Sequence, residues 1–317
     1  MTVTIGATLS GGGELVMGEL RTSEPMSRHT SWRAGGVAKR FFKPDNLDEL
    51  ATFLAQTPGD EPIVWIGLGS NLLVRDGGIN GSVICTSGVL GKMALLESDL
   101  IRAEAGVPCA KFARFSVRFG LAGAEFLIGI PGTIGGALAM NAGAFGGETW
   151  PIVEAVETMD RQGRRYLRTP EEYRIAYRNV VGPVDEWFIA GHFRLKIARE
   201  DGLSRTRVLL DKRNETQPTG QASCGSVFRN PEGDFAGRLI EACGLKGHAI
   251  GGAFVSEKHA NFIINGGDAT AADIEALIQF IIARVEAEQE VRLEPEVHIV
   301  GDAVPVTEMP ASGMEEQ

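Results

Sequence analysis

The strongest constraint on this chain is a pair of glycine-rich segments, residues 67–71 and 129–147. Glycine accounts for 41 of the 317 residues, nearly twice the usual share of about 7%. The first segment directly follows a short apolar run, Ile63 to Ile66. Because glycine has no side chain, such segments let the backbone approach a ligand closely. Converging backbone N–H groups bind the negative charge of a pyrophosphate, so both segments are predicted to be phosphate-binding loops.

The residues expected to contact a nucleotide cofactor lie in these two segments or directly after them. Leu72 stands where a dinucleotide fingerprint has its third glycine, and neither segment carries the lysine of a nucleoside-triphosphate loop. A tight turn between strands is the alternative for each segment. The candidates for cofactor binding are Gly67, Gly69, Ser70, Asn71, Leu72, Pro131, Gly132, Thr133, Ile134, Gly135, Gly136, Asn141 and Gly143.

The composition is that of a globular protein with a sizeable core, with 44% hydrophobic and 23% charged residues. A formal net charge of -10 disfavours a nucleic-acid partner, which requires a basic face. No signal-peptide pattern is seen, and no run approaches the ~18 apolar residues of a membrane span. We therefore expect a cytoplasmic protein that binds neither nucleic acid nor membrane. The 4 cysteines and 5 histidines lack metal-ligand spacing, so free thiols and no metal are expected.

Several residues mark predicted helix starts. Asn46 and Thr270 are N-cap residues in front of apolar residues with helical spacing. Pro108 suits the first turn of a further helix, and Thr169, followed by Pro and by Glu three positions on, forms a capping box. Strands are predicted at 37–43, 63–66 and 72–74. This mixture favours an α+β fold with several lobes.

Besides the glycine loops, the chain carries six short blocks in a recognisable order: His29 to Gly36, Tyr177-Arg178-Asn179, Cys224 to Pro231, Leu245 to His248, Ile250 to Ala253 and Leu293 to Val297. With these blocks, the sequence from Ser27 to Gly301 resembles the UDP-N-acetylenolpyruvoylglucosamine reductase family. Its glycine loops also resemble those of the FAD-binding folds shared with vanillyl-alcohol oxidase. One departure is Val180, which stands where the family often has serine.

The resemblance implies a fold of the α+β class. A two-lobed FAD-binding fold of the vanillyl-alcohol oxidase type would hold noncovalent FAD, and a C-terminal α+β substrate-binding domain would close over the substrate. It also implies the shorter class of the family, which lacks an inserted substrate loop with a tyrosine. The expected parts are an N-terminal extension (1–20), FAD-binding lobes (21–84 and 85–212), the substrate-binding domain (213–303) and a disordered tail (304–317).

The resemblance also implies the reaction. The enzyme would use FAD and NADPH to reduce UDP-N-acetylglucosamine enolpyruvate to UDP-N-acetylmuramate for peptidoglycan synthesis. Apart from the resemblance, we expect a monomer. Hydride would pass from N5 of reduced FAD to the enolpyruvyl group, and negative charge would build next to its carboxylate. Ser226 matches the family's proton donor. Arg178 matches the arginine that would hold this charge. Glu296 would polarise the enolpyruvyl group or deliver a proton.

Each of these residues also has an ordinary structural interpretation. Gly225-Ser226 is typical of a turn, Arg178 of a solvated strand end, and the acid Glu296 of an exposed edge strand. Alternation over 291–299 leaves Glu296 facing either solvent or a cleft. Alternative functions are another flavin oxidoreductase on the same fold and a non-catalytic nucleotide-binding module. The candidates for substrate binding are Tyr177, Arg213, Arg229, Asn230 and Lys246.

Overall fold

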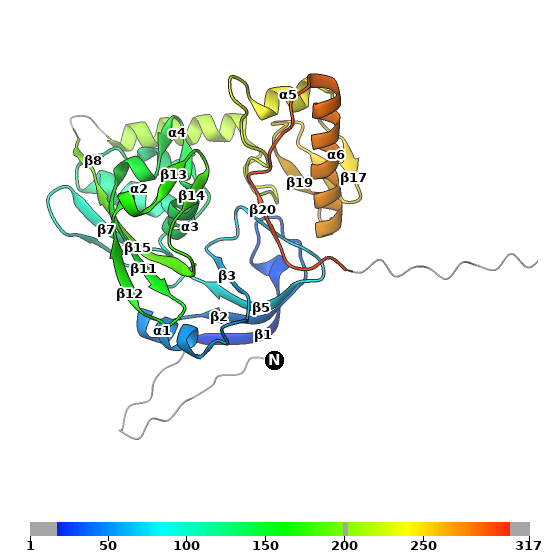
Figure 1. The fold of residues 1–317 in the computed structure, drawn as a ribbon. Coiled ribbons are helices and arrows are strands. Elements are labelled where there is room, and N and C mark those ends of the chain that lie inside the picture. Colours follow the sequence, from blue (N-terminus) through cyan, green and yellow to red (C-terminus); the bar gives the residue numbers. More distant parts are fainter. Residues whose placement is uncertain (1–17, 199–201, 305–317) are drawn as a thin grey trace, which may run out of the picture.

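The computed structural model describes residues 18–198 and 202–304. Figure 1 shows two sheet-containing lobes in the first part of the chain and a third lobe formed by its last part. The long helix α4 (Gly202–Thr216) runs from the second lobe to the third. The fold belongs to the α+β class, as predicted. The predicted tail lies, except for Val304, outside the described residues, as does most of the predicted N-terminal extension.

The first lobe is a sheet in the order β1-β2-β5-β3 covered by helix α1. Asn46 caps α1 as predicted, because its side-chain oxygen accepts the backbone N–H groups of Asp48 and Glu49, both at 3.0 Å. The elements are β1 (Glu19–Pro25), β2 (Val37–Lys43), α1 (Leu47–Gln56), β3 (Ile63–Ile66), β4 (Leu72–Val74) and β5 (Ile79–Cys85).

The second lobe is an antiparallel sheet in the order β12-β11-β15-β7-β6, with α2 and α3 in its core. A small hairpin, β13–β14, packs against the same core through Ile175 and Val180. The elements are β6 (Met93–Leu95), β7 (Leu100–Glu104), α2 (Cys109–Arg118), β8 (Leu121–Ala122), α3 (Ile134–Met140), β9 (Gly143–Ala144), β10 (Gly147–Glu148), β11 (Val153–Asp160), β12 (Arg165–Arg168), β13 (Arg174–Ala176), β14 (Asn179–Val181), β15 (Glu186–Arg194) and β16 (Lys196–Ile197).

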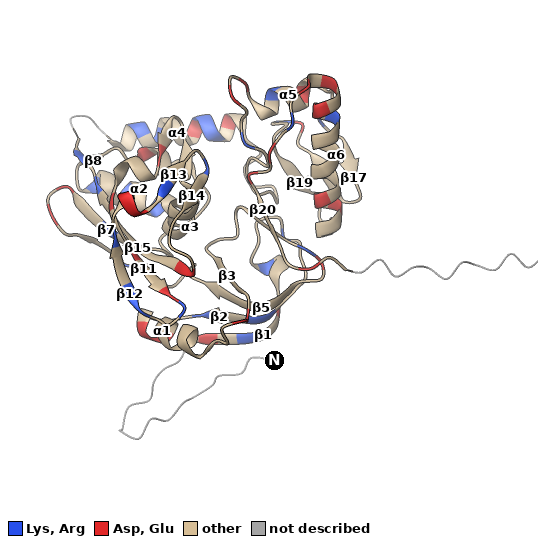
Figure 2. Ribbon diagram, viewed as in Figure 1, with Lys and Arg blue, Asp and Glu red and all other residues tan. Residues whose placement is uncertain are grey.

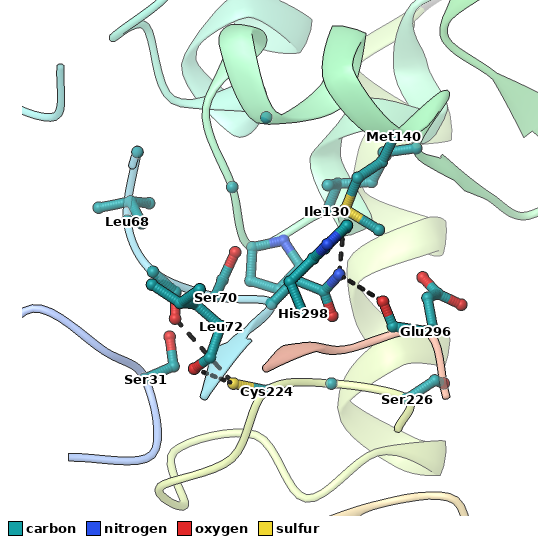
Figure 3. Close-up of a pocket in the computed structure, with 18 of the residues that line it drawn as sticks. Ser31, Leu68, Ser70, Leu72, Ile130, Met140, Cys224, Ser226, Glu296 and His298 are labelled. Atoms are coloured by element: carbon teal, nitrogen blue, oxygen red, sulfur yellow. Dashed lines mark hydrogen bonds between the residues drawn. The ribbon is translucent and has the colours of Figure 1, made fainter. Parts of the chain in front are cut away.

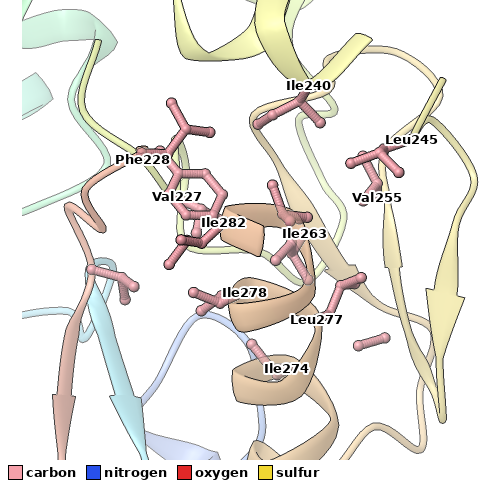
Figure 4. Close-up of a cluster of buried hydrophobic side chains, with 14 of the residues drawn as sticks. Val227, Phe228, Ile240, Leu245, Val255, Ile263, Ile274, Leu277, Ile278 and Ile282 are labelled. Carbon is pink, nitrogen blue, oxygen red and sulfur yellow. The ribbon is translucent and has the colours of Figure 1, made fainter. Parts of the chain in front are cut away.

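The third lobe packs against one face of helix α6. The apolar residues of this face lie in the buried cluster of Figure 4, together with residues from the rest of the lobe such as Ile240, Val255 and Ile263. Thr270 caps this helix as predicted, accepting the N–H of Asp273 at 3.0 Å. The remaining elements, besides α4, are α5 (Ala236–Ala242), β17 (Ala249–Ile250), β18 (Ala253–Val255), β19 (Ile263–Asn265), α6 (Ala271–Gln289) and β20 (His298–Val300).

The first lobe is joined firmly to the third. Trp32 is fully buried in the core of the third lobe, and its Nε1 donates to the carbonyl of Ile263 at 2.8 Å. Strand β20 pairs in parallel with β4 of the first lobe. The carboxylate of Asp76 accepts the N–H groups of Ala271 and Ala272 at the start of α6. These contacts set the distance between the glycine loop after β3 and the last strand.

Several sequence-based boundaries differ from the structure. Strand β1 begins at Glu19 because Glu19 and Leu20 pair with β2, so the sheet includes residues predicted to be extension. The predicted boundary between 212 and 213 falls inside α4. Pro108 is the N-cap of α2 and so lies just before the first turn in which it was predicted. Thr169 precedes only a 3₁₀ turn, Pro170–Glu172.

None of the helices in the described ranges has the length and apolar character needed to cross a bilayer.

Charged residues of both signs occur along α4 (Figure 2), where Arg205, Arg207 and Arg213 are interspersed with Asp211 and Glu215.

Candidate active site

A cavity of about 940 Å³ lies between residues contributed by all three lobes. Its volume is in the range of small-molecule and cofactor pockets, roughly 300–1,000 Å³. One part of its wall comes from the two glycine loops, and another from residues 213–230 and Glu296. In Figure 3, Leu68 of the first glycine loop lies at one end of the cavity, and Ser226 and Glu296 lie at the other.

The two glycine loops face each other closely. A Cβ atom on Gly67 would lie 2.3 Å from Oγ1 of Thr133, which precedes α3 in the second loop. Gly69 has a φ of +60°, and a Cβ there would lie 2.0 Å from the carbonyl oxygen of His29. A side chain on Gly67 would push the two loops apart, and one on Gly69 would clash with the backbone at His29, so packing requires glycine at both positions.

One hydroxyl group at the contact between the two loops has no hydrogen-bond partner in the described part of the chain. Thr133 Oγ1 is buried and has no hydrogen-bond partner among the described residues. A Cβ on Gly136 would have only this hydroxyl near it, at 3.9 Å, so the backbone is open on that side. An unpaired buried hydroxyl beside an open helix start fits a bound phosphate oxygen. The residues present therefore fit the pyrophosphate of FAD.

The open space at Gly136 leads to a prediction about cofactor binding. Replacing Gly136 by leucine is expected to weaken FAD binding strongly, because the new side chain would project into the cavity. The stability of the FAD-free protein should hardly change. Titration of the apoprotein with FAD, followed by flavin fluorescence, measures the first effect, and thermal unfolding of the apoprotein measures the second.

Gly135 is the control for this substitution. It does not line the cavity, and its Cβ would lie 2.9 Å from that of Ala105 in the core. Gly135→Leu should therefore destabilise the apoprotein itself by overpacking, by about 1–3 kcal/mol. Unchanged FAD affinity in Gly136→Leu would show that the second loop is only a turn.

Arg178 lies at the tip of the β13–β14 hairpin, next to Tyr177. Its φ of +53° is in the left-handed region that residues other than glycine rarely adopt. Its Nη2 donates to the carbonyl of Gly143 at 2.7 Å and its Nη1 to that of Asn141 at 3.3 Å. Its Nε lies 3.2 Å from Oε1 of Glu296. These contacts hold the guanidinium in one orientation at the cavity wall.

Ser226 lies on the segment that connects α4 to α5 and lines the cavity. It follows Gly225, whose φ of +75° is unfavourable for other residues. The neighbouring Cys224 is buried, and its Sγ lies 3.5 Å from the carbonyl oxygen of Leu72. Burial raises the pKa of the Cys224 thiol to about 12, so this thiol packs and does not act as a nucleophile.

Glu296 faces the cavity and not bulk solvent, which settles the alternative that the sequence left open. Its side chain is only 16% exposed. Its backbone N–H donates to the carbonyl of Val227 at 2.7 Å, and its carbonyl accepts Nδ2 of Asn71 at 2.9 Å. Burial raises the pKa of its carboxyl above the ordinary glutamate value, and Arg178 and Arg229 oppose this rise.

Most of the predicted site residues line this one cavity, and a smaller group does not. Burial lowers the pKa of Arg213, one of the cationic residues of the wall. The predicted residues in the wall are Gly67, Gly69, Ser70, Asn71, Leu72, Pro131, Gly132, Thr133, Gly136, Gly143, Tyr177, Arg178, Arg213, Ser226, Asn230 and Glu296.

Ile134, Gly135, Asn141, Arg229 and Lys246 do not line the cavity. Ile134 is fully buried in the second lobe. The side chain of Asn141 is used internally, accepting the N–H of Trp150 and donating to Glu148. Arg229 donates instead to the carbonyl of Arg178 at 3.2 Å. Lys246 pairs with Glu241 at 2.7 Å, outside the cavity.

Sequence patterns did not single out several other residues of the wall, among them Met140, Asn261 and His298. Alternation could have found His298, because it lies two residues after Glu296 in an extended segment. Asn261 lies far from the other site residues in sequence, and only the fold brings it to the segment of Ser226.

Comparisons with known proteins match both parts of the chain that border this cavity. A family model described as an FAD binding domain matches residues 38–166, which include both glycine loops. A second model, described as the C-terminal domain of UDP-N-acetylenolpyruvoylglucosamine reductase, matches residues 217–300. Together with the cavity between the two matched parts, they define the protein as an FAD-dependent oxidoreductase.

Similar proteins with this reductase name occur in Alkalilimnicola ehrlichii, 58% identical over 90% of this chain and 96% of its own length, and in Legionella pneumophila strain Corby, 56% identical over 90% and 94%. A crystal structure of UDP-N-acetylenolpyruvylglucosamine reductase from Thermus caldophilus is 32% identical, covers 89% of this chain and 98% of its own, and has a TM-score of 0.76. The chain belongs to the UDP-N-acetylenolpyruvoylglucosamine reductase family.

Proposed function

We propose that this enzyme reduces UDP-N-acetylglucosamine enolpyruvate to UDP-N-acetylmuramate with NADPH, in the synthesis of peptidoglycan precursors. The observation that carries the proposal is the meeting of Arg178, Ser226 and Glu296 at one end of a cavity whose remaining wall includes the glycine loops. Membership of the family supports this choice of substrate.

The test uses the purified protein with its cofactor. The protein should be yellow, should release FAD on denaturation, and should oxidise NADPH only when the UDP-enolpyruvyl sugar is present. Flavin that remains attached to the denatured chain, or NADPH oxidation that does not depend on this sugar, would contradict the proposal.

The chemistry places separate demands on the protein. The glycine loops in the cavity wall would hold FAD, which would supply hydride transfer between NADPH and the enolpyruvyl group. Arg178, with its orientation set by three partners, holds the substrate carboxylate and the negative charge that develops beside it. Ser226 donates a proton to the carbon that bears the carboxylate. Glu296 polarises the enolpyruvyl group or delivers a proton, and burial raises the pKa of its carboxyl against the opposing effect of Arg178 and Arg229.

The role of Arg178 depends on its planar shape. Arg178→Lys is expected to lower kcat by ~10²–10³. An ammonium group lacks the planar fork that lets a guanidinium bond the carbonyls of Asn141 and Gly143 and also the substrate carboxylate. Flavin content must be measured alongside kcat, because Arg178 bonds the carbonyls of Asn141 and Gly143 in the second glycine loop, and only a loss of kcat per bound flavin counts for this role. Steady-state NADPH oxidation in the presence of the substrate measures the loss.

Arg174→Lys is the matched control. Arg174 lies on the same hairpin but is exposed, so its replacement should leave kcat unchanged. Arg178→Lys with the activity of the Arg174→Lys control would remove Arg178 from the mechanism.

For the UDP part of the substrate, we propose Tyr177, Arg213 and Asn230 as contacts, because they line the cavity. We also propose that the first two lobes hold FAD and that residues 213–303 form the substrate-binding domain. Replacement of Arg213 should raise the KM for the UDP sugar and leave the rate of FAD reduction by NADPH unchanged.

We further propose that the protein is a cytoplasmic monomer. All four cysteines are free and buried, which suits a reducing compartment. Light scattering should show one species of 33.9 kDa, and cell fractionation should recover the enzyme with the soluble proteins.

A further inference from the structure

The segment that carries Ser226 is held by a buried residue of the third lobe, Asn261. This residue is 3% exposed. Its Oδ1 accepts the N–H of Phe228 at 2.9 Å, and its Nδ2 donates to the carbonyl of the same residue at 2.8 Å. Its own carbonyl accepts the N–H of Val227 at 2.9 Å. Asn261 therefore bonds three backbone groups of the two residues that follow Ser226.

The opposite edge of the same segment is bonded to the chain around Glu296. The carbonyl of Val227 accepts the N–H of Glu296 at 2.7 Å, and the N–H of Arg229 donates to Glu294 at 2.9 Å. The segment thus lies between Asn261 on one side and Glu296 on the other. Among the described residues, no group bonds the hydroxyl of Ser226 itself, so its position depends on the backbone that follows it.

We propose that Asn261 is a positioning residue for Ser226, an inference that rests on the proposed role of Ser226 as the proton donor. A carboxamide presents an acceptor oxygen at one end and a donor NH₂ at the other, and here these match the N–H and C=O of Phe228. An aspartate would present an oxygen to the Phe228 carbonyl, and an alanine would leave both backbone groups unpaired. Displacement of a reacting group by about 1 Å can slow a reaction ~10²-fold.

The third lobe contains a matched residue for comparison. Asn265 is also buried, and its carboxamide also bonds backbone groups only. It donates to Trp32 at 2.7 Å and accepts from Gly267 and Ala269 at 2.7 and 3.1 Å. Its carboxamide does not bond the segment of Ser226. Loss of this side chain should therefore leave buried backbone groups unpaired, as loss of the Asn261 side chain does, but without displacing Ser226.

The experiment follows both half-reactions by rapid-mixing absorbance in Asn261→Ala, Asn261→Asp and Asn265→Ala holoenzymes. In both Asn261 variants, reduction of bound FAD by NADPH should stay nearly unchanged, and reoxidation by the UDP-enolpyruvyl sugar should slow, by ~10²-fold in Asn261→Ala. The solvent deuterium isotope effect on reoxidation should increase, because proton delivery becomes the slow step. Asn265→Ala should change neither rate. Asn261→Asp, which keeps the size of the side chain, carries the test if the alanine variant does not fold.

A double substitution separates this inference from the role of Ser226. Adding Asn261→Ala to Ser226→Ala should cause no further slowing, because no proton donor is left to position. Additive slowing, equal effects on both half-reactions, or equal effects of Asn261→Ala and Asn265→Ala would overturn the positioning role. Normal reoxidation in Ser226→Ala alone would instead overturn the proton-donor role.

Discussion

Ser226→Ala is expected to leave the reduction of bound FAD by NADPH nearly intact and to slow its reoxidation by the UDP-enolpyruvyl sugar by ~10²–10⁴. Only the second half-reaction requires a proton on carbon. Ser226 lines the end of the cavity where Glu296 lies, so its loss should affect that step alone. Rapid-mixing absorbance of the flavin measures the two half-reactions separately.

Two further measurements sharpen this result. Ser226→Cys keeps a transferable proton at the same place, so it should retain more activity than the alanine variant. In deuterated water, the product of the unmodified enzyme should carry solvent deuterium at the carbon that bears the carboxylate. Slowed flavin reduction with normal reoxidation in Ser226→Ala would mean that Ser226 shapes the nicotinamide site and donates no proton.

The sequence predicted those parts of the fold that are determined locally. Asn46 and Thr270 cap helices as expected, because an N-cap bonds N–H groups only two or three residues away. The predicted strand 37–43 has the bounds of β2. Very short strands such as β9 and β10 could not be predicted, because their two-residue pairing depends on the surrounding lobe.

The packing of the first lobe against the third could not be predicted from the sequence, for a different reason. Trp32 belongs to a recognisable block near the N-terminus, yet it is buried in the core of the third lobe. Its hydrogen-bond partner, Ile263, lies 231 positions further along the chain. No local pattern specifies a contact of this range.

The three predicted catalytic side chains and the predicted residues of the second glycine loop differ in how they lie relative to the cavity. Arg178, Ser226 and Glu296 were each named from the sequence, and all three line the cavity. Only some of the predicted residues of the second loop line the cavity, because α3 turns Gly136 toward the cavity and Gly135 toward the core. The helix begins inside the motif, so a list of its residues could not show which of them face a ligand.

The junction between the first and third lobes leads to the last prediction. Trp32→Ala is expected to lower the free energy of unfolding by about 3–5 kcal/mol, because it removes a fully buried aromatic side chain. It also leaves the carbonyl of Ile263 without its hydrogen bond. Urea unfolding, followed by circular dichroism, measures the loss.

The location of the increased hydrogen exchange distinguishes loss of this junction from a general loss of packing. Trp150 is also buried, and its Nε1 donates to Leu138 at 2.8 Å, but it lies within the second lobe. Trp150→Ala should destabilise the protein similarly and increase hydrogen exchange around α3. Trp32→Ala should increase exchange in β19 and in the paired strands β4 and β20, because Trp32 connects the lobes that carry them. Unchanged exchange in β19, β4 and β20 would show that the remaining contacts, such as those of Asp76 with α6, hold the two lobes together without Trp32.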